Sequence, residues 1–370
     1  MTPNTMSLKR ACGLVVAAMA VPSMGNPLVH DVQVPSLVAR EATADGPLVD
    51  GPCVTNSTIQ RVTWFGERPS YRRDGQKIAF MSKSYGDVFE LDLRTQHIKL
   101  LTGWPHSGFL RAQYLINNDL FLIGARNFTD MKTTRAHDME MWILKPGAKE
   151  VIPLNHKIYE GVAISIQSNK ISWANNHDQY PDQFNENESA VYVADIDYSS
   201  GKPCLANKRE VFRATAPNCT PEPQDFRNND TEIVYTCYAT DPTHPNAFYG
   251  RVEGIKIDTG EKVVYRDVPG QYNEVEGMYP NEKYALVESA WSIKNNATPS
   301  VQGIDIYQLR LEPNSTDWKR LTYFSETKPW KAGNPVVSPD GRSMCVQSSR
   351  NDQEAGVGYG LYIQDLFIDK

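Results

Sequence analysis

Two segments near opposite ends of the chain share one pattern, in which an Asp-Gly pair stands between two apolar runs. Asp74-Gly75 lies within residues 69–80, and Asp340-Gly341 lies within residues 335–346. An Asp-Gly between alternating apolar residues is the strongest short-range signal for a β-hairpin, because the turn needs positive φ angles that these residues tolerate. Hairpins that recur along a chain indicate an architecture built from repeated β units.

Between these two segments the chain divides into four further units, each with three or four short strand-like runs. Each unit is close to the ~40–50 residues of a β-propeller blade. The units span residues 109–154, 160–213, 222–267 and 274–323. Together with the two terminal segments they make six repeats, so the sequence predicts an all-β protein with the fold of a six-bladed β-propeller.

The sixth repeat holds only three predicted strands before Lys370. A closed ring needs a fourth strand, and the apolar run of residues 59–65 ahead of the first repeat can supply it. Closure leaves few open sheet edges, which all-β proteins must avoid. We therefore expect residues 51–370 to form a single propeller closed by an N-terminal strand. The alternative is a two-sheet β-sandwich, which the regular four-strand units disfavour.

The terminal repeats carry the resemblance to a known class of repeat. With its Asp-Gly hairpin, most fully in Pro339-Asp340-Gly341, the repeat resembles the TolB-type, Pro-Asp-containing propeller repeat. The likeness is close in the first and last units and weak in the middle ones. It implies the same propeller fold.

The N-terminus resembles a secretion signal. Lys9 and Arg10 precede the short apolar run of residues 11–20, and the small residues Ser23 and Gly25 follow it. A membrane-spanning helix needs ~20 apolar residues, so residues 1–25 are predicted to be a signal peptide and residues 26–50 an N-terminal extension. No later segment is long and apolar enough to span a membrane. We expect the protein in the secretory pathway, either secreted or in a vesicle lumen.

Seven Asn-X-Ser/Thr sequons support the secretory route. The predicted glycosylation sites are Asn56, Asn127, Asn187, Asn218, Asn229, Asn296 and Asn314.

Five cysteines remain after removal of the signal peptide, and an oxidising compartment favours two disulfides and one free thiol. Cys53 can reach Cys345 if the N-terminal strand completes the last blade. The other three, Cys204, Cys219 and Cys237, offer competing pairs. Since no Cys-X-X-Cys or Cys/His ligand spacing occurs, we expect no metal site.

The net charge of −6 is modest and its signs are mixed. Neither nucleic acid nor a polybasic contact with a membrane is indicated. The sequence has no glycine-rich phosphate loop and no Gly-X-Ser-X-Gly motif. We therefore expect no cofactor, and we expect the partners to be small-molecule substrates bound in a central funnel. The sequence leaves the oligomeric state open.

Charged and amide side chains fall together when the repeats are aligned by their first strands, which line a propeller's channel. Two repeats share a Glu-Gly pair, so we expect Glu160 and Glu276 at equivalent positions facing the axis. Converging carboxylates in a partly dry funnel raise one another's pKa, as a general acid or base requires. The predicted catalytic residues are Glu160, Glu276, Arg111 and Lys331. The alternative is that the glutamates cap strand ends or pair with Arg111.

Aromatic residues fall at the inter-blade entrances to the same funnel. Flat rings suit sugar faces or an apolar polycyclic ligand. The predicted substrate-binding residues are Trp64, Tyr71, His106, Gln113, Glu222 and Trp330. The alternative for most of the aromatic residues is packing between blades.

Such a funnel can serve a carbohydrate-cleaving enzyme or a non-catalytic binding protein, and neither function requires a cofactor. Paired acid and base groups suit a polysaccharide lyase or a glycoside-cleaving enzyme. Residues 160–165 and 170–176 resemble the saponin hydrolases that fungi secrete. Oligogalacturonate lyases share the repeat type, but they hold a metal with several histidines, and this sequence shows no such histidine set. A non-catalytic binding propeller is the alternative.

A third function follows from a resemblance of the whole chain. As a small, single-domain propeller with sequons and a signal peptide, it resembles the fungal hetero-Diels–Alderases of tropolone–sesquiterpenoid biosynthesis. The resemblance transfers no active residue, but it implies the joining of a tropolone quinone methide to a humulene-type alkene with no cofactor. Such a reaction needs a pocket that orients two partners, which can be worth several orders of magnitude in rate. A donor such as Lys331 or Arg111 would polarise the tropolone carbonyl, and a carboxylic acid would assist loss of water.

Overall fold

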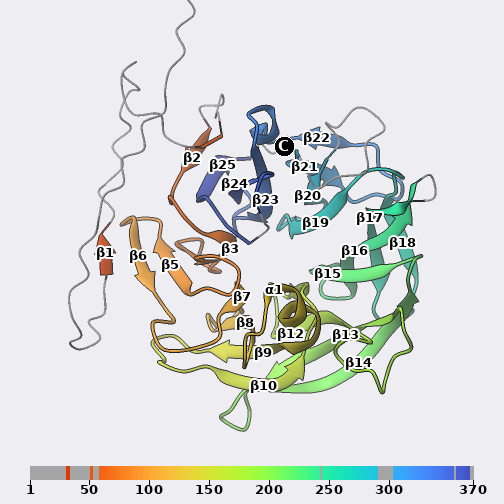
Figure 1. Cartoon of the computed structure of the whole chain (residues 1–370), viewed down its shortest axis with the longest axis horizontal. Helices are drawn as coiled ribbons and strands as arrows, with labels where there is room; N and C mark the ends of the chain where they lie inside the picture. The colour runs from red at the N-terminus through yellow and green to blue at the C-terminus, as the bar shows by residue number, and fades with distance from the viewer. Residues whose placement is uncertain are drawn as a thin grey trace, which may run out of the picture. The chain divides into compact units, whose positions relative to one another are not determined.

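A computed structural model describes residues 51–52, 58–241, 244–290, 303–353 and 356–366, together with the backbone of β1 (Asp31–Gln33). Six antiparallel sheets follow one another around a central axis, which confirms the six-bladed propeller (Figure 1). A two-sheet sandwich is excluded. No helix among the described residues is long and apolar enough to cross a membrane.

In the first five blades the chain runs from the innermost strand outward, whereas the outer strand of the sixth blade comes from the segment that precedes the first blade. The innermost strands are β3 (Glu67–Tyr71), β7 (Phe109–Tyr114), β11 (Val162–Ile164), β15 (Thr220–Arg227), β19 (Asn273–Met278) and β23 (Trp330–Val337). The second strands are β4 (Lys77–Met81), β8 (Leu120–Ala125), β12 (Lys170–Asn176), β16 (Glu232–Asp241), β20 (Tyr284–Ser289) and β24 (Ser343–Arg350).

The third strands are β5 (Val88–Asp92), β9 (Met139–Leu144), β13 (Glu188–Asp197), β17 (His244–Lys256), β21 (Asp305–Arg310) and β25 (Leu361–Asp365). The outer strands are β6 (His97–Leu100), β10 (Ile152–Lys157), β14 (Cys204–Thr215), β18 (Lys262–Arg266), β22 (Trp318–Arg320) and β2 (Ile59–Arg61). β1 adds a fifth strand beside β6. The short helical segments are α1 (Met131–Thr133), the π-helical turn Thr134–Asp138 and the 3₁₀ turn Phe324–Glu326.

The predicted hairpin turns have the backbone that the sequence requires. Gly75 and Gly341 have φ angles of 70° and 74°. The aspartate before each glycine accepts a hydrogen bond from the backbone N–H two residues further along the chain. Asp74 Oδ1 accepts from Gln76 N at 3.0 Å, and Asp340 Oδ1 accepts from Arg342 N at 3.1 Å. The two Asp-Gly motifs therefore join the first and second strands of their blades.

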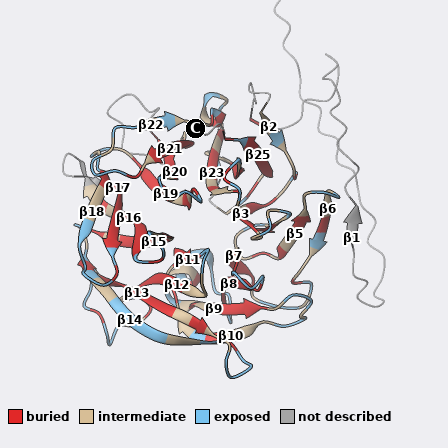
Figure 2. Cartoon of the chain, turned by 180° about the vertical axis from the view of Figure 1, so that it is seen from behind, coloured by how far each residue is buried: buried red, intermediate tan, exposed pale blue. Residues whose placement is uncertain are grey.

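The hydrophobic core lies between adjacent blades rather than along the axis. In the third blade, the second and third strands, β12 and β13, are buried almost throughout. The outer strand of this blade, β14, is exposed along much of its length (Figure 2). One cluster joins the second and third blades around Phe121, Met141 and Trp173. Burial of such faces on both sides of each blade holds neighbouring blades at a fixed distance.

The N-terminal strand closes the ring, as predicted. β2 pairs antiparallel with β25, with Ile59 opposite Gln364 and Arg61 opposite Tyr362. Just beyond β2, the buried Thr63 Oγ1 accepts a hydrogen bond from Leu361 N at 2.8 Å and donates one to Phe65 O at 2.7 Å. Thr102 and Thr322 accept from the third strands of their own blades in the same way, at Val88 N and Ile306 N.

One of the competing cysteine pairs forms. Cys219, directly before β15, is bonded to Cys237 on β16. Cys204 is an exposed free thiol and Cys345 a buried one, whose pKa burial raises. Cys53, the predicted partner of Cys345, lies outside the described residues.

Two of the predicted glycosylation sites, Asn56 and Asn296, also lie outside the described residues. The other five are exposed, as a modified asparagine must be: Asn127, Asn187, Asn218, Asn229 and Asn314. Their occupancy stays a prediction.

Closure by β2 predicts a specific loss of stability. Thr63→Val keeps the shape of the side chain but leaves the buried Leu361 N–H without its acceptor, which we expect to lower the free energy of unfolding by about 1–3 kcal/mol. Denaturant titration measures it. Thr259→Val, at an exposed turn, is the control and should change stability by less than about 0.5 kcal/mol. Equal stability of the two variants would show that this contact does not hold the ring closed.

Candidate functional site

A cavity of about 640 Å³ lies where the innermost strands begin. Five blades supply its wall through β3, the segment before β11, β15, β19 and β23, and the insertion between β8 and β9 contributes Arg135. Its volume falls within the ~300–1,000 Å³ typical of ligand sites. The cavity is thus the predicted central funnel.

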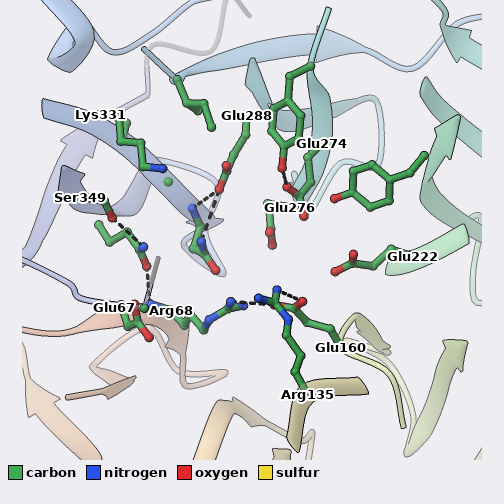
Figure 3. A pocket seen from close by; sticks show the side chains of 18 of the residues that line it. Glu67, Arg68, Arg135, Glu160, Glu222, Glu274, Glu276, Glu288, Lys331 and Ser349 are labelled. Atoms are coloured by element: carbon green, nitrogen blue, oxygen red, sulfur yellow. Dashed lines mark hydrogen bonds and ion pairs between the residues drawn. The ribbon is translucent and has the colours of Figure 1, made fainter. Parts of the chain in front are cut away.

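Six glutamates line the cavity, against four cationic side chains (Figure 3). The glutamates are Glu67, Glu160, Glu222, Glu274, Glu276 and Glu288, and the cations are Arg68, Arg135, Lys331 and Arg350. The remaining lining includes an apolar and aromatic set: Tyr159, Ala216, Pro217, Tyr238, Ala239, Tyr272, Ile304, Ala332 and Val357.

Glu160 is held by two arginines. Arg68 Nη2 donates to its Oε1 at 2.7 Å, and Arg135 donates to its Oε2. Arg135 lies in the π-helical turn after α1, so this ion pair ties the insertion to the cavity wall. Glu160 is 5% exposed, and a buried carboxylate needs such partners to remain charged.

A second acidic group lies opposite, on β15 and β19. Gln224 Nε2 donates to Glu222 Oε1 at 3.2 Å, and the Tyr272 hydroxyl donates to Glu274. Arg111, buried beneath the cavity on β7, contacts Glu276 Oε2 at 3.5 Å and Gln224 Oε1 at 3.4 Å. One arginine therefore faces a group of three carboxyls.

Glu288 occupies a position that recurs around the ring. Three innermost strands have a register shift at which a backbone N–H donates to the second strand of the preceding blade. Arg68 N donates to Gln347 Oε1 at 2.7 Å, Val275 N to Thr236 Oγ1 at 3.0 Å, and Asn334 N to Glu288 Oε1 at 2.5 Å. Two blades use a neutral acceptor here, so joining the blades does not require a carboxyl group.

Burial shifts the pKa values of these groups toward their neutral forms. Desolvation, followed by the charge of Glu276, raises the pKa of Glu288 to about 7. The same cause raises the pKa of Glu274 well above its usual value, with Glu276 and Glu222 adding to the shift. Desolvation also raises the pKa of Glu222, against the charge of Arg111, and lowers that of Lys331. The cavity therefore holds protonated carboxyls near neutral pH.

The predicted catalytic residues meet at this cavity. Glu160, Glu276 and Lys331 line it, and Arg111 contacts Glu276 from below. The expected equivalence of the two Glu-Gly pairs is wrong: Glu160 precedes β11 by two residues, whereas Glu276 lies at a register shift inside β19. They converge from different positions in their blades.

Of the predicted substrate-binding residues, Glu222 lines the cavity and the other five do not. Trp64 is half exposed beneath the Arg61 guanidinium, Tyr71 is buried in the core cluster between the first and last blades, and Trp330 is buried against Tyr359 of its own blade. His106 hydrogen-bonds to Asp87 at 2.9 Å, and Gln113 lies on β7 outside the lining. The proposed site does not include these five residues. The rings at the cavity are instead Tyr159, Tyr238 and Tyr272.

Sequence reasoning missed several charged residues of the lining, among them Glu67, Glu274, Glu288 and Arg135. Glu67 and Glu274 lie on innermost strands. Glu274 and Glu222 hold equivalent positions in their blades, because each pairs with an equivalent residue of the second strand. That pairing was a usable signal. Glu288 and Arg135 gave none, because they come from a second strand and from an insertion.

Metal ligation is not suggested by side-chain proximity. Among the described residues, the group with suitable spacing is Cys219, Cys237 and Glu253. The two cysteines form the disulfide, so neither can bind a metal as a thiolate.

No protein-family model and no curated protein matches the sequence. Solved structures with a similar fold include an oligogalacturonate lyase from Vibrio parahaemolyticus, with 11% identity over 86% of this chain and 96% of that one and a TM-score of 0.48. A putative gluconolactonase has 12% identity, covers 85% and 94%, and gives 0.49. TolB from Acinetobacter baumannii has 14% identity, covers 79% and 69%, and gives 0.44. These likenesses concern the fold, and we draw nothing about activity from them.

The raised pKa of Glu288 predicts how stability changes with pH. A carboxyl whose pKa is higher in the folded state stabilises the fold below its unfolded pKa of about 4.5, and this contribution is lost as pH rises through about 7. Stability should therefore fall between pH 5 and pH 8. Glu288→Gln keeps the acceptor for Asn334 N and should reduce the fall by about 1–3 kcal/mol.

Chemical denaturation at several pH values gives the measurement. The control is Glu150→Gln, in an exposed loop, which should leave the pH dependence of the wild type unchanged. If Glu288→Gln followed the wild-type curve, Glu288 would already be ionised in the folded protein.

Proposed function

We propose that the protein is a cofactor-independent hetero-Diels–Alderase that joins a tropolone quinone methide to a humulene-type sesquiterpene. The observation that carries the proposal is Glu288, an acid with a pKa of about 7 at a position where two other blades use a neutral acceptor. Its carboxyl group is unnecessary for joining blades, which leaves a chemical role. The choice of reaction rests on the chain's resemblance in architecture, length and secretory character to that enzyme family.

The charge of the lining favours a neutral ligand. Burial shifts Glu274, Glu288 and Lys331 toward their neutral forms, and the arginines of the lining are paired with carboxylates, so an anionic oligosaccharide such as a polyuronate would find little free positive charge there. A tropolone and a terpene alkene carry no negative charge. The apolar side chains of Ala216, Pro217, Ile304 and Val357 give the hydrocarbon a surface on which to bury itself.

The acid form of Glu288 supports the first step. It donates a proton to the hydroxyl group of a hydroxymethyl-tropolone as the C–O bond breaks, and water leaves. The tropolone hydroxyl gives its proton to a second carboxyl group of the lining that acts as the base, for which we propose Glu276. The product is a neutral quinone methide, and the two carboxyl groups regain their starting states by exchanging a proton with solvent.

Lys331 supports the second step. Its amino group donates a hydrogen bond to the quinone methide carbonyl and lowers the energy of the electron-poor diene. The diene carbon and oxygen then each form one σ bond to the alkene, which closes a dihydropyran ring. Holding both partners against one wall supplies the orientation that the reaction lacks in solution.

A glycoside-cleaving enzyme is the second candidate. The cavity places carboxyls in opposite environments: Glu160 lies between two arginines, whereas Glu288 accepts a hydrogen bond from a backbone amide and burial raises its pKa to about 7. One ionised and one protonated carboxyl is the combination that glycoside hydrolysis uses. The charge argument then favours neutral sugars over uronates.

We also propose that the chain passes through the secretory pathway. The exposure of the five described sequon asparagines supports this assignment, together with the N-terminal basic and apolar segments.

The test of the reaction uses the glycosylated mature chain with a hydroxymethyl-tropolone and humulene. We expect an enantioselective dihydropyran adduct above the protein-free background, measured by chiral chromatography with mass spectrometry. The rate should fall above about pH 7, as Glu288 ionises. Glu288→Gln should slow formation of the quinone methide by about 100-fold or more, and Lys331→Met should slow the cycloaddition by about 100-fold.

Glu150→Gln and Lys149→Met are matched surface controls and should keep the wild-type rate. Adduct at background level would refute the cycloaddition. Cleavage of neutral glycosides in the same preparation would then establish the second candidate, and inactivity on both would favour a binding propeller.

A further inference from the structure

Lys331 differs from the other cations of the cavity in having no close partner. Arg68 and Arg135 are both bound to Glu160, and Arg350 pairs with Asp352 at 2.8 Å. Among the residues that the structure describes, the Lys331 amine makes no hydrogen bond and no ion pair within 4.0 Å. Figure 3 shows its nitrogen directed into the cavity.

The surroundings of Lys331 favour the neutral amine. Burial lowers the pKa of Lys331, against the opposing charges of Glu288 and Glu274. Burial also shifts those two carboxyls toward their neutral forms, which weakens their opposing effect. A lysine that is desolvated and lacks an ion-pair partner is the kind that acts as a nucleophile.

The backbone of β23 places an acid beside this amine. Lys331 and Asn334 lie on the same strand, and Asn334 N donates to Glu288 Oε1. Between them, Gly333 has no side chain: a Cβ there would stand 3.3 Å from Glu288 Oε1. Glycine thus leaves open space next to the carboxyl group, in the direction of the cavity that both residues line.

We infer that Lys331 is a nucleophilic amine that forms an imine with an aldehyde bound in the cavity, with Glu288 as the proton donor. The amine nitrogen attacks the carbonyl carbon, and the oxygen takes the proton of Glu288 to give a carbinolamine. The nitrogen then returns a proton to the Glu288 carboxylate, the oxygen receives a second proton from Glu288, and water leaves. The iminium that remains gives its N–H proton back to the Glu288 carboxylate, which yields the imine and restores the acid. Amine and aldehyde give imine and water, without any oxidant or reductant.

This inference does not rest on the proposed function. A tropolone carbonyl is electronically a vinylogous acid and reacts poorly with amines, so in the proposed cycloaddition Lys331 only donates a hydrogen bond. An aldehyde is a stronger electrophile, and the same amine attacks it. An aldehyde of suitable size would therefore occupy the cavity covalently, whatever its natural substrate is.

Reductive trapping tests the imine. The full glycosylated chain is incubated with benzaldehyde and sodium cyanoborohydride, which reduces an imine to a stable benzylamine, and the labelled lysines are quantified by peptide mass mapping over time. We expect Lys331 to be labelled about tenfold or more faster than the exposed Lys149, because more of its amine is neutral. Equal rates for the two lysines would overturn the inference.

Variants separate the cavity from general surface labelling. Lys331→Arg keeps a cation but cannot form an imine, and it should remove the fast phase; a fast phase that survives would place the reactive amine elsewhere. Lys149→Arg should leave the fast phase unchanged. Glu288→Gln, assayed at a temperature at which it remains folded, should slow the labelling of Lys331, and an unaltered rate would exclude Glu288 as the proton donor.

Discussion

The pairing of β2 with β25 is the constraint on which the rest of the structure depends. It joins residues 298 positions apart at the contact between Thr63 and Leu361, and it completes the sixth blade. Only in a closed ring do the innermost strands of all blades face one axis. The cavity takes its side chains from five blades and one insertion, so its geometry exists only when this last strand is in place.

Closure also explains why a propeller can bury so many acidic groups. Each register shift on β3, β19 and β23 turns a backbone N–H toward the preceding blade, where a side chain accepts it. A threonine, a glutamine and a glutamate fill this one role in three blades. Where the acceptor is Glu288, the fold supplies a hydrogen bond that retains the side chain, while burial keeps its proton.

The sequence was sufficient for the fold because its signals are local. The Asp-Gly turns at Asp74 and Asp340 and the spare strand before the first repeat identified the blades and their closure. It was sufficient for part of the site, because innermost strands line the axis by architecture; Glu222, Glu276 and Lys331 follow from that rule. Glu288 and Arg135 do not, since their approach to the cavity depends on a register shift and on an insertion. The aromatic residues misled for a physical reason: large rings are also the side chains that fill the core, as Tyr71 does between the first and last blades and Trp330 does against Tyr359.

The two unusual groups of the cavity explain one another. A neutral amine beside an ionised carboxylate would gain a proton, and a protonated carboxyl beside a free ammonium would lose one. Burial works against both charged forms at once, so Lys331 and Glu288 are both shifted toward neutrality, and a proton can pass from the acid to a bound ligand at little electrostatic cost. That state is destroyed if an anion enters or if water fills the cavity. A neutral, largely apolar ligand preserves the neutral forms of Lys331 and Glu288. The charge of the substrate, rather than the fold, therefore discriminates among the reactions that we propose for this funnel.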